Sequence, residues 1–195
     1  MSFFPTEPDI PDPDFIDLPT HPWQKPPSDE LPASLAVSKL LAVNEHVAVI
    51  LAGVNAYREG VEFVVVRRIR RGELSQEEWA DKASYGARAA GRLGSRRLRY
   101  GVALSNGERV IDNLMVGVMQ EEGPEGHVLV PTGGGGHGDA RSFEYDDRLW
   151  LWPLPPEGML EFVTAWPAVD IPETRMQLDA TLLRSLAQQT RPIWG

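Results

Sequence analysis

The sequence predicts an all-β protein built as an antiparallel β-sandwich with immunoglobulin-like architecture. Eight or nine short apolar runs rich in valine and isoleucine are separated by turn-rich segments, and they do not alternate with helices as in a doubly wound sheet. The chain has no cysteine, so the Cys…Trp…Cys spacing of true immunoglobulin domains is absent and the term describes architecture only. An open β-barrel is the alternative fold.

The chain divides into an acidic, proline-rich N-terminal arm, residues 1–32, and a single β-sandwich domain, residues 33–195. The arm carries nine of the 17 prolines and seven acidic residues against one lysine. Because proline removes backbone donors and like charges repel, the arm is not expected to fold independently. Its aromatic side chains, including Trp23, leave two alternatives open: a loosely draped arm, or an arm docked on the domain.

Three apolar runs follow the arm, ASLAVSKLLAV, HVAVILAGV and VEFVVVRRIR, and their composition is typical of strands. The second and third runs are separated by residues 56–60, a break of hairpin length in which Gly60 can adopt positive φ. Apolar residues on both faces of the second run indicate a central strand or a covered sheet.

Two short helices are predicted in addition to the strands. Ser75 and Glu78 form the S-x-x-E pattern of a capping box, which predicts a short helical excursion near residues 75–93. At the other end of the domain, Asp179 is a candidate N-cap for a short C-terminal helix with a leucine-rich face.

Alternation and turn chemistry predict the later strands. Apolar and basic or small residues alternate over residues 97–104, which indicates a half-buried strand. Asn106 and Gly107 follow as a strong hairpin signal. Two further strands are expected over residues 149–152 and 160–166, each ended by proline.

A run of glycines, Gly133, Gly134, Gly135 and Gly136, separates two of these strands. The run lacks the G-K-[ST] ending of a P-loop and precedes a strand, whereas phosphate-binding loops lead into a helix. We therefore expect a flexible connecting loop, with the alternative of a loop that orders around a partner or ligand.

Two polar residues, His137 and Asp139, follow the glycines and form an H-x-D pair. Imidazole and carboxylate together can hold a divalent cation, but this spacing matches no established metal site, and no metal or other cofactor is predicted. Both residues are kept as candidates for binding a ligand or partner.

The strand after the glycine run carries Trp150 and Trp152 on the face opposite Leu149 and Leu151. If the leucines face the core, the tryptophans need a second layer or the N-terminal arm to cover them. Left uncovered, they would form an exposed aromatic patch of the kind that marks a binding surface.

The net charge of −9 argues against general nucleic-acid binding, but ten basic and four acidic residues lie between Arg67 and Arg99. Arginines in this segment form a candidate stripe that would read phosphate backbones. The stripe comprises Arg67, Arg68, Arg70, Arg71, Arg96, Arg97 and Arg99. Pairing with acidic residues of the same chain, or with an acidic protein, is the alternative.

Several catalytic chemistries lack their residues. Without cysteine there is no thiolate nucleophile, and G-x-S-x-G and HExxH are absent. The acidic start is unlike a signal peptide, and no apolar run reaches the length of a membrane span. The sequence favours a cytoplasmic protein that is not an enzyme.

Several segments are similar to a group of small actinobacterial proteins of unknown function. These are LAGVNAYREGVEFVVV, VLVPTGGGG, WLWPLPPEG, FVTAWPAVDIPETRMQLD and RPIW. The resemblance covers roughly residues 30–195 and implies a recurring single-domain architecture. It implies no activity and no functional residue.

The first functional hypothesis is a non-enzymatic cytoplasmic β-sandwich that acts through protein contacts, with a protein partner or a second copy of itself. The second is a small-ligand-binding protein or enzyme with its site at the glycine run and the tryptophans. The third is a nucleic-acid binder on the arginine stripe, which the net charge disfavours.

Overall fold

The computed structural model describes residues 20–80, 97–113 and 123–194, and over these ranges the predicted all-β class is confirmed. The strands are β1 (Glu30–Leu31), β2 (Ala33–Leu35), β3 (Lys39–Val43), β4 (Val47–Ala56), β5 (Val61–Arg70), β6 (Arg99–Ala103), β7 (Arg109–Ile111), β8 (Val128–Gly138), β9 (Ser142–Trp152), β10 (Met159–Trp166), β11 (Ile171–Asp179) and β12 (Arg191–Pro192). Helical structure comprises residues 76–80, the 3-10 turn η1 (Pro167–Val169) and α3 (Ala180–Ala187).

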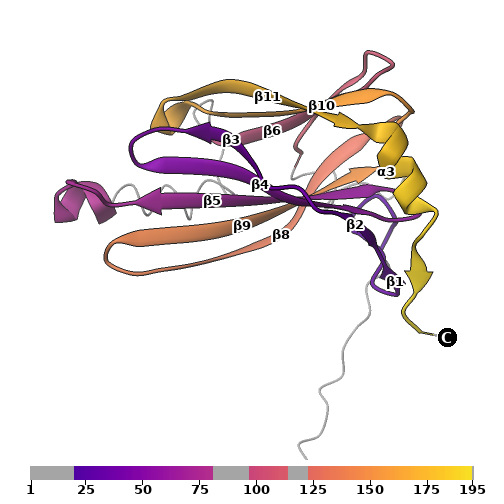
Figure 1. Cartoon of the computed structure of the whole chain (residues 1–195), viewed down its shortest axis with the longest axis horizontal. Coiled ribbons are helices and arrows are strands. Elements are labelled where there is room, and N and C mark those ends of the chain that lie inside the picture. The colour runs from indigo at the N-terminus through magenta and orange to yellow at the C-terminus, as the bar shows by residue number, and fades with distance from the viewer. Residues whose placement is uncertain (1–19, 81–96, 114–122, 195) are drawn as a thin grey trace, which may run out of the picture.

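Two antiparallel sheets form the layers of the molecule (Figure 1). The larger has the order β2-β4-β5-β9-β8, with β3 also paired to β4, and the smaller has the order β11-β10-β6-β7. A bridge between Asp112 and Leu129 links the β7 end of one sheet to β8 of the other, and β3 contacts β11 at the opposite edge. This layered arrangement is compatible with the predicted sandwich, while the strand order does not establish an immunoglobulin-like fold.

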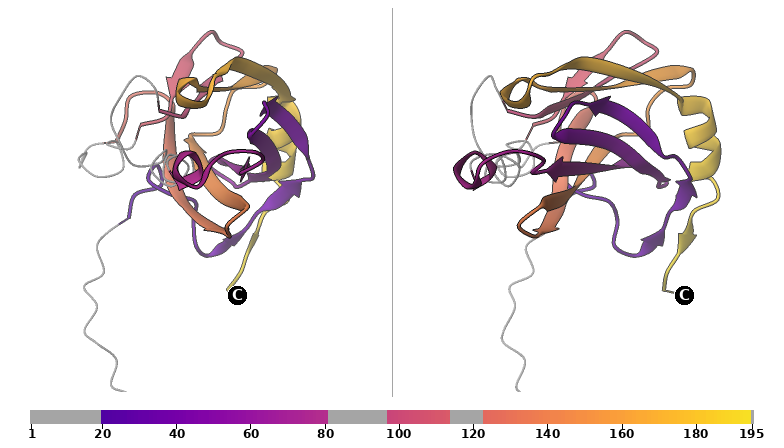
Figure 2. Two further views of the ribbon diagram at one scale, coloured as in Figure 1. Left: turned by 90° about the vertical axis from the view of Figure 1, so that its left-hand side faces the viewer. Right: turned by 60° about the vertical axis from the view of Figure 1, so that its left-hand side comes forward.

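The core lies between the two sheets and follows the alternation of apolar residues. Val47, Val49 and Leu51 of β4 are buried, and the rings of Phe63 and Phe162 pack across the layers with centroids 4.9 Å apart. Burying an aliphatic or aromatic side chain of this size stabilises the fold by about 1.5–3 kcal/mol. Helix α3 covers one end of the layers (Figure 2).

The predicted caps and turns are present. Glu78 N donates to Ser75 Oγ and Ser75 N donates to the Glu78 carboxylate, so the capping box closes in both directions. Residues 81–93 of the predicted helical excursion lie outside the described ranges. Asp179 caps α3 by accepting from Thr181 N and Leu182 N. Among the described residues, no helix is long and apolar enough to cross a membrane.

The prediction that the glycine run is a loop is wrong. Gly133–Gly136 belong to β8 and pair antiparallel with Tyr145–Arg148 of β9. The turn between these strands comes later, where Asp139 N donates to the carbonyl of Ser142. Glycine has low strand propensity, but β9 offers this segment a complete row of backbone partners.

The last residues of the predicted arm form a short strand. Glu30 and Leu31, inside the predicted arm, form β1 and pair with β12 near the C-terminus. The described part of the arm before β1 turns back on itself and lies against the outer face of β9, where it reaches Trp150. Residues 1–19 lie outside the described ranges.

Candidate functional site

A buried ion pair joins the two central strands of the larger sheet on its inner face. Arg67 of β5 donates through Nε to Asp147 Oδ2 and through Nη2 to Asp147 Oδ1, at 2.5 and 2.8 Å. The two residues are 2% and 8% exposed. Removing both charges from water costs several kcal/mol per ion, and close geometry with further hydrogen bonds is needed to offset that cost. The bidentate contact provides that geometry.

The Arg67 guanidinium is held between aromatic rings of the two layers. Its Cζ lies 4.8 Å from the centroid of Tyr145 in β9 and 5.5 Å from that of Trp166 in β10. Tyr145 stacks in turn on Phe143, and Phe143 packs against Trp79 of the short helix. This column of rings fixes the position of the guanidinium through cation–π and stacking contacts.

Tyr100 of β6 connects the smaller sheet to the ion pair. Its hydroxyl donates to Asp147 Oδ2 over 2.7 Å. Burial, followed by the negative charge of Asp147, holds the pKa of Tyr100 well above its ordinary value. The phenol therefore stays protonated at neutral pH and remains a hydrogen-bond donor to Asp147.

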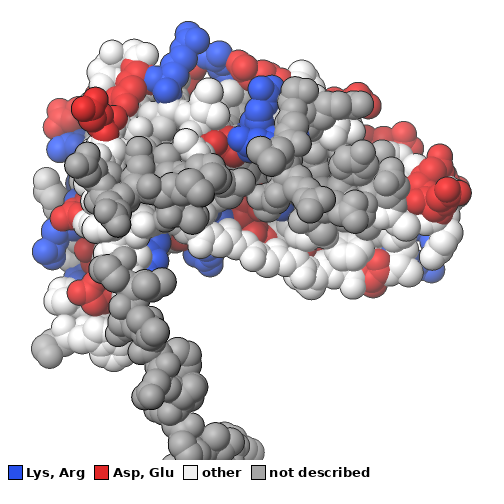
Figure 3. Space-filling model, turned by 180° about the vertical axis from the view of Figure 1, so that it is seen from behind, with Lys and Arg blue, Asp and Glu red and all other residues white. Residues whose placement is uncertain are grey.

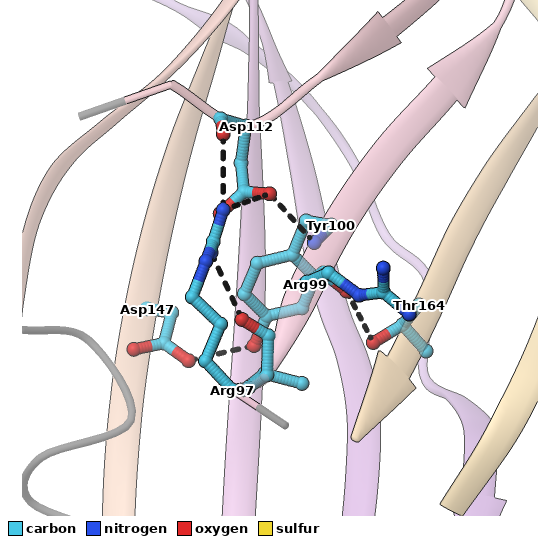
Figure 4. Close-up of polar contacts among 7 residues, drawn as sticks. Arg97, Arg99, Tyr100, Asp112, Asp147 and Thr164 are labelled. Carbon is cyan, nitrogen blue, oxygen red and sulfur yellow. Dashed lines mark hydrogen bonds and ion pairs between the residues drawn. The ribbon is translucent and has the colours of Figure 1, made fainter. Parts of the chain in front are cut away.

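A second ion pair, between Arg97 and Asp112, lies near Tyr100 and Asp147 (Figure 4). Arg97 Nη1 donates to Asp112 Oδ2 over 2.5 Å and also to the carbonyl of Leu98, and Asp112 Oδ1 accepts from the backbone N–H of Tyr100. Burial raises the pKa of Asp112, although Arg97 acts in the opposite direction. Tyr100 therefore contacts both ion pairs, because its backbone N–H donates to Asp112 and its hydroxyl donates to Asp147.

The glycine strand forms one wall of the space in front of these groups. A Cβ on Gly136 would collide with the ring of Tyr145, and a Cβ on Gly138 would stand 2.5 Å from the ring of Phe143. Gly133 and Gly135 have open space at the corresponding position. Glycine is thus required at alternate positions, where aromatic rings of β9 lie over β8.

Together these elements line an open cavity of about 430 Å³, which we call the glycine-walled pocket. Apolar side chains form much of its wall, and the two ion pairs and Tyr100 supply the polar groups. Its lining comprises Arg67, Arg97, Leu98, Tyr100, Asp112, Pro131, Gly133, Gly134, Gly135, Gly136, Tyr145, Asp146, Asp147 and Leu149.

The residues predicted to form one site lie in three places. Gly133–Gly136 line the glycine-walled pocket, whereas His137 and Asp139 line a different cavity of about 750 Å³ that also contains His46. The Asp139 carboxylate accepts from the N–H groups of Arg141 and Ser142, which lowers its pKa and assigns it to the β8–β9 turn. Within the described ranges, no group of three histidine or acidic side chains is placed to hold a metal ion.

Trp150 and Trp152 lie on the outer face of β9, as predicted, with Leu149 and Leu151 in the core. Trp150 is 0% exposed because the arm covers it: its Nε1 donates to the carbonyl of Pro22 over 2.8 Å. Of the two covers that the sequence allowed, a second layer or the N-terminal arm, the arm is the one that covers Trp150.

The arginine stripe is divided between the interior and the surface. Arg67 and Arg97 are engaged in the ion pairs described above, and the exposed Arg68 bonds Glu144 over 2.6 Å. Arg70 and Arg71 donate to backbone carbonyls, and Arg96 lies outside the described residues. On the face shown in Figure 3, basic and acidic side chains are interspersed.

Sequence reasoning missed the central groups of the pocket, although a signal was present. Arg67 has the same strand parity as Phe63 and Val65, and Asp147 has the same parity as Leu149 and Leu151. A charged residue in phase with buried apolar neighbours indicates a buried charge that needs a partner. Since the two strands lacked a predicted register, the partners could not be matched.

Comparison with models of protein families, with curated proteins and with solved structures finds no match to this chain. The resemblance to small actinobacterial proteins gains no support from these comparisons.

Proposed function

We propose that the chain binds a small, uncharged, largely apolar ligand that carries a hydrogen-bond donor, in the glycine-walled pocket. The volume of about 430 Å³ lies within the range of roughly 300–1,000 Å³ typical of small-molecule sites. A mainly apolar wall with a few convergent polar groups, some with shifted pKa values, is also characteristic of such sites.

The proposed ligand is uncharged because both arginines that line the pocket already have carboxylate partners. Arg67 and Arg97 each have a carboxylate partner, Asp147 and Asp112 respectively. An anionic ligand would have to compete with those carboxylates, and a cationic ligand with the guanidiniums. Breaking one buried pair leaves an uncompensated charge at a cost of about 3–5 kcal/mol, so a neutral ligand fits best.

The proposed ligand carries a hydrogen-bond donor because the Asp147 carboxylate can accept one more hydrogen bond. This capacity of Asp147 is the observation that carries the proposal. An ionised carboxylate has about four acceptor positions. In the described structure three are used: by Arg67 Nε, by Arg67 Nη2 and by the Tyr100 hydroxyl. A ligand hydroxyl or amide N–H would use the remaining position on Oδ1.

Four probes that share one ring test this proposal. Cyclohexanol has the donor, methoxycyclohexane lacks it, and cyclohexylamine and cyclohexanecarboxylate add a charge of either sign. Titration of the full chain, followed by the amide signals of Gly133–Gly136 in a two-dimensional NMR spectrum, should give a Kd of about millimolar for cyclohexanol. Each of the other three should bind at least about tenfold more weakly, a difference of about 1.4 kcal/mol.

Equal shifts with the alcohol and its methyl ether would contradict the donor requirement. Tighter binding of the amine or of the carboxylate would contradict the neutral ligand. If no probe moves the glycine amides, the pocket does not take ligands of this class and the proposal fails.

A second candidate function, contact with another protein or a second copy of the chain, is favoured by a separate observation. Leu31, Ile193 and Trp194 are exposed large apolar side chains on or beside the small β1–β12 sheet, and Trp194 is 75% exposed. Contiguous exposed apolar surface often marks an interaction site. Sedimentation at increasing concentration should reveal association that Trp194→Ala abolishes; a concentration-independent monomer would contradict self-association.

A further inference from the structure

The outer face of β9 carries two tryptophan side chains that make aromatic contacts. We call it the Trp face, made of Trp150 and Trp152 and bordered by Tyr57. The Tyr57 ring meets Trp150 edge-on, with centroids 5.5 Å apart and an angle of 87°. Gly60 makes room for the indole, since a Cβ there would stand 2.5 Å from the Trp150 ring.

The described part of the arm occupies this face as a closed turn. Gln24 N donates to the carbonyl of His21, and His21 N donates back to Gln24 Oε1. The rings of His21 and Trp23 stack at 4.2 Å with an angle of 7°. The turn thus holds its own shape through local bonds.

The turn is attached to the domain by contacts of modest strength. Trp150 Nε1 donates to the carbonyl of Pro22, and the rings of Trp23 and Trp152 pack 6.0 Å apart. A neutral hydrogen bond contributes about 0.5–1.5 kcal/mol net, and an aromatic pair a similar amount. Such contacts can exchange for those of another peptide.

The arm leaves one donor of the Trp face unused. Trp152 Nε1 is buried and has no hydrogen-bond partner in the described structure. A buried unsatisfied donor costs about 1–3 kcal/mol. An occupant that offers carbonyls to both indoles would make a bond that the arm does not make, and this gives it a physical advantage over the arm.

We propose that the Trp face is a docking surface for a proline-containing segment of another protein, and that residues 20–27 cover this surface in its absence. The chemistry of the partner follows from the occupant already present. Residues 20–27 read THPWQKPP, and Pro22 supplies the carbonyl that Trp150 binds. Proline segments present carbonyls without competing N–H groups and pack well on aromatic side chains.

The arm acts as an intramolecular competitor with an effective concentration of about millimolar. A peptide therefore binds the intact chain weakly and binds more tightly once the arm is released. Trp23→Ala releases it without altering β9, because Trp23 contributes the ring that packs on Trp152. Lys25→Ala is the matched control, since Lys25 lies in the same segment outside these ring contacts.

The test uses the full chain and a labelled peptide with the sequence of residues 18–29, followed by fluorescence anisotropy. The Trp23→Ala chain should bind the peptide at least about tenfold more tightly than the unaltered or Lys25→Ala chain. Adding Trp150→Phe, which removes the indole donor, should weaken that binding about two- to tenfold. Circular dichroism verifies that each variant is folded.

Three outcomes would overturn the proposal. Equal affinity of the Trp23→Ala and unaltered chains would show that the arm does not compete. Unchanged affinity after Trp150→Phe would place the peptide elsewhere. A stable dimer of the unaltered chain with exchanged arms would show that the occupant is a second copy. None of these results depends on the glycine-walled pocket, which involves different residues.

Discussion

The two ends of the β8–β9 ribbon differ in how their side chains pack. At the glycine end, the rings of Tyr145 and Phe143 leave no space for a Cβ on Gly136 or Gly138, and the backbone carbonyl of Asp146 leaves none on Gly134. At the tryptophan end, β9 presents large side chains outward, and the arm covers them. One end has an open, mainly apolar space that contains a few charged groups, and the other has a covered aromatic surface on the outer face of β9.

The two ends of the β8–β9 ribbon are suited to different kinds of binding. Charged groups inside a protein demand partners, so the glycine end is specific in its hydrogen bonds and rigid in its geometry. Indole and proline contacts tolerate exchange, so the tryptophan end is suited to a competing peptide. Separate variants at the two ends should therefore have separable effects.

The largest expected effect comes from breaking the ion pair at the glycine end. Asp147→Ala leaves Arg67 buried without its carboxylate and removes the acceptor of the Tyr100 hydroxyl. The free energy of unfolding should fall by about 3–5 kcal/mol, as measured by chemical denaturation.

A matched triple variant separates stability from function. Arg67→Met, Tyr100→Phe and Asp147→Leu together replace the polar cluster with apolar side chains, which is often neutral or stabilising by about 1–4 kcal/mol. This variant should recover the stability lost in Asp147→Ala while failing to bind cyclohexanol. If it is as unstable as Asp147→Ala, the cluster is required for folding itself.

The next effect tests the alternation of glycines. Gly136→Ala places a methyl group against the Tyr145 ring, and overpacking of this kind costs about 1–3 kcal/mol. Gly135→Ala places the same methyl group in open space and should change stability by less than about 0.5 kcal/mol. Equal thermal denaturation midpoints for the two variants would refute the alternation.

Much of the fold follows from local patterns. The alternation at Val47, Val49 and Leu51 and the reciprocal cap of Ser75 and Glu78 depend on near neighbours, and both are present. The hairpin at Asn106 and Gly107 also forms, with Gly107 at φ 89°. Such features depend on steric and hydrogen-bonding rules that act within a few residues.

The candidate site was less predictable because its causes are distant in sequence. The glycine run reads as a loop from its own composition, and only pairing with β9 makes it a strand. Arg67 reads as surface charge until Asp147, 80 positions later, is placed opposite it. The arm reads as disordered until Trp150 provides a donor for Pro22. In each case tertiary contacts override a local preference.

A smaller effect distinguishes the tyrosines of the two ends. Burial, with a smaller contribution from Glu62, raises the pKa of Tyr57 to about 12. The unfolded chain ionises this phenol near 10, so its contribution to stability is complete below pH 10 and is lost as pH rises towards 12. Tyr57→Phe should remove that alkaline loss and change little at neutral pH. Tyr100→Phe should already destabilise at neutral pH, because it removes a bond to Asp147.

The smallest effect concerns the start of β8, at the tryptophan end. Glu108 accepts from His127 N over 2.9 Å, and this bond, with the His127 side chain, lowers the pKa of Glu108. A lowered pKa contributes stability that is present above the unfolded value near 4.5 and is lost as pH falls through the folded value. Glu108→Gln should therefore flatten the fall in unfolding free energy below pH 4.5. The exposed Glu59→Gln serves as the control for removal of a charge, and identical acid profiles of the two variants would contradict a role for the His127 contact. Because Glu108 is separated from the ion pairs of the glycine end, Gly135→Ala should leave this acid profile unchanged.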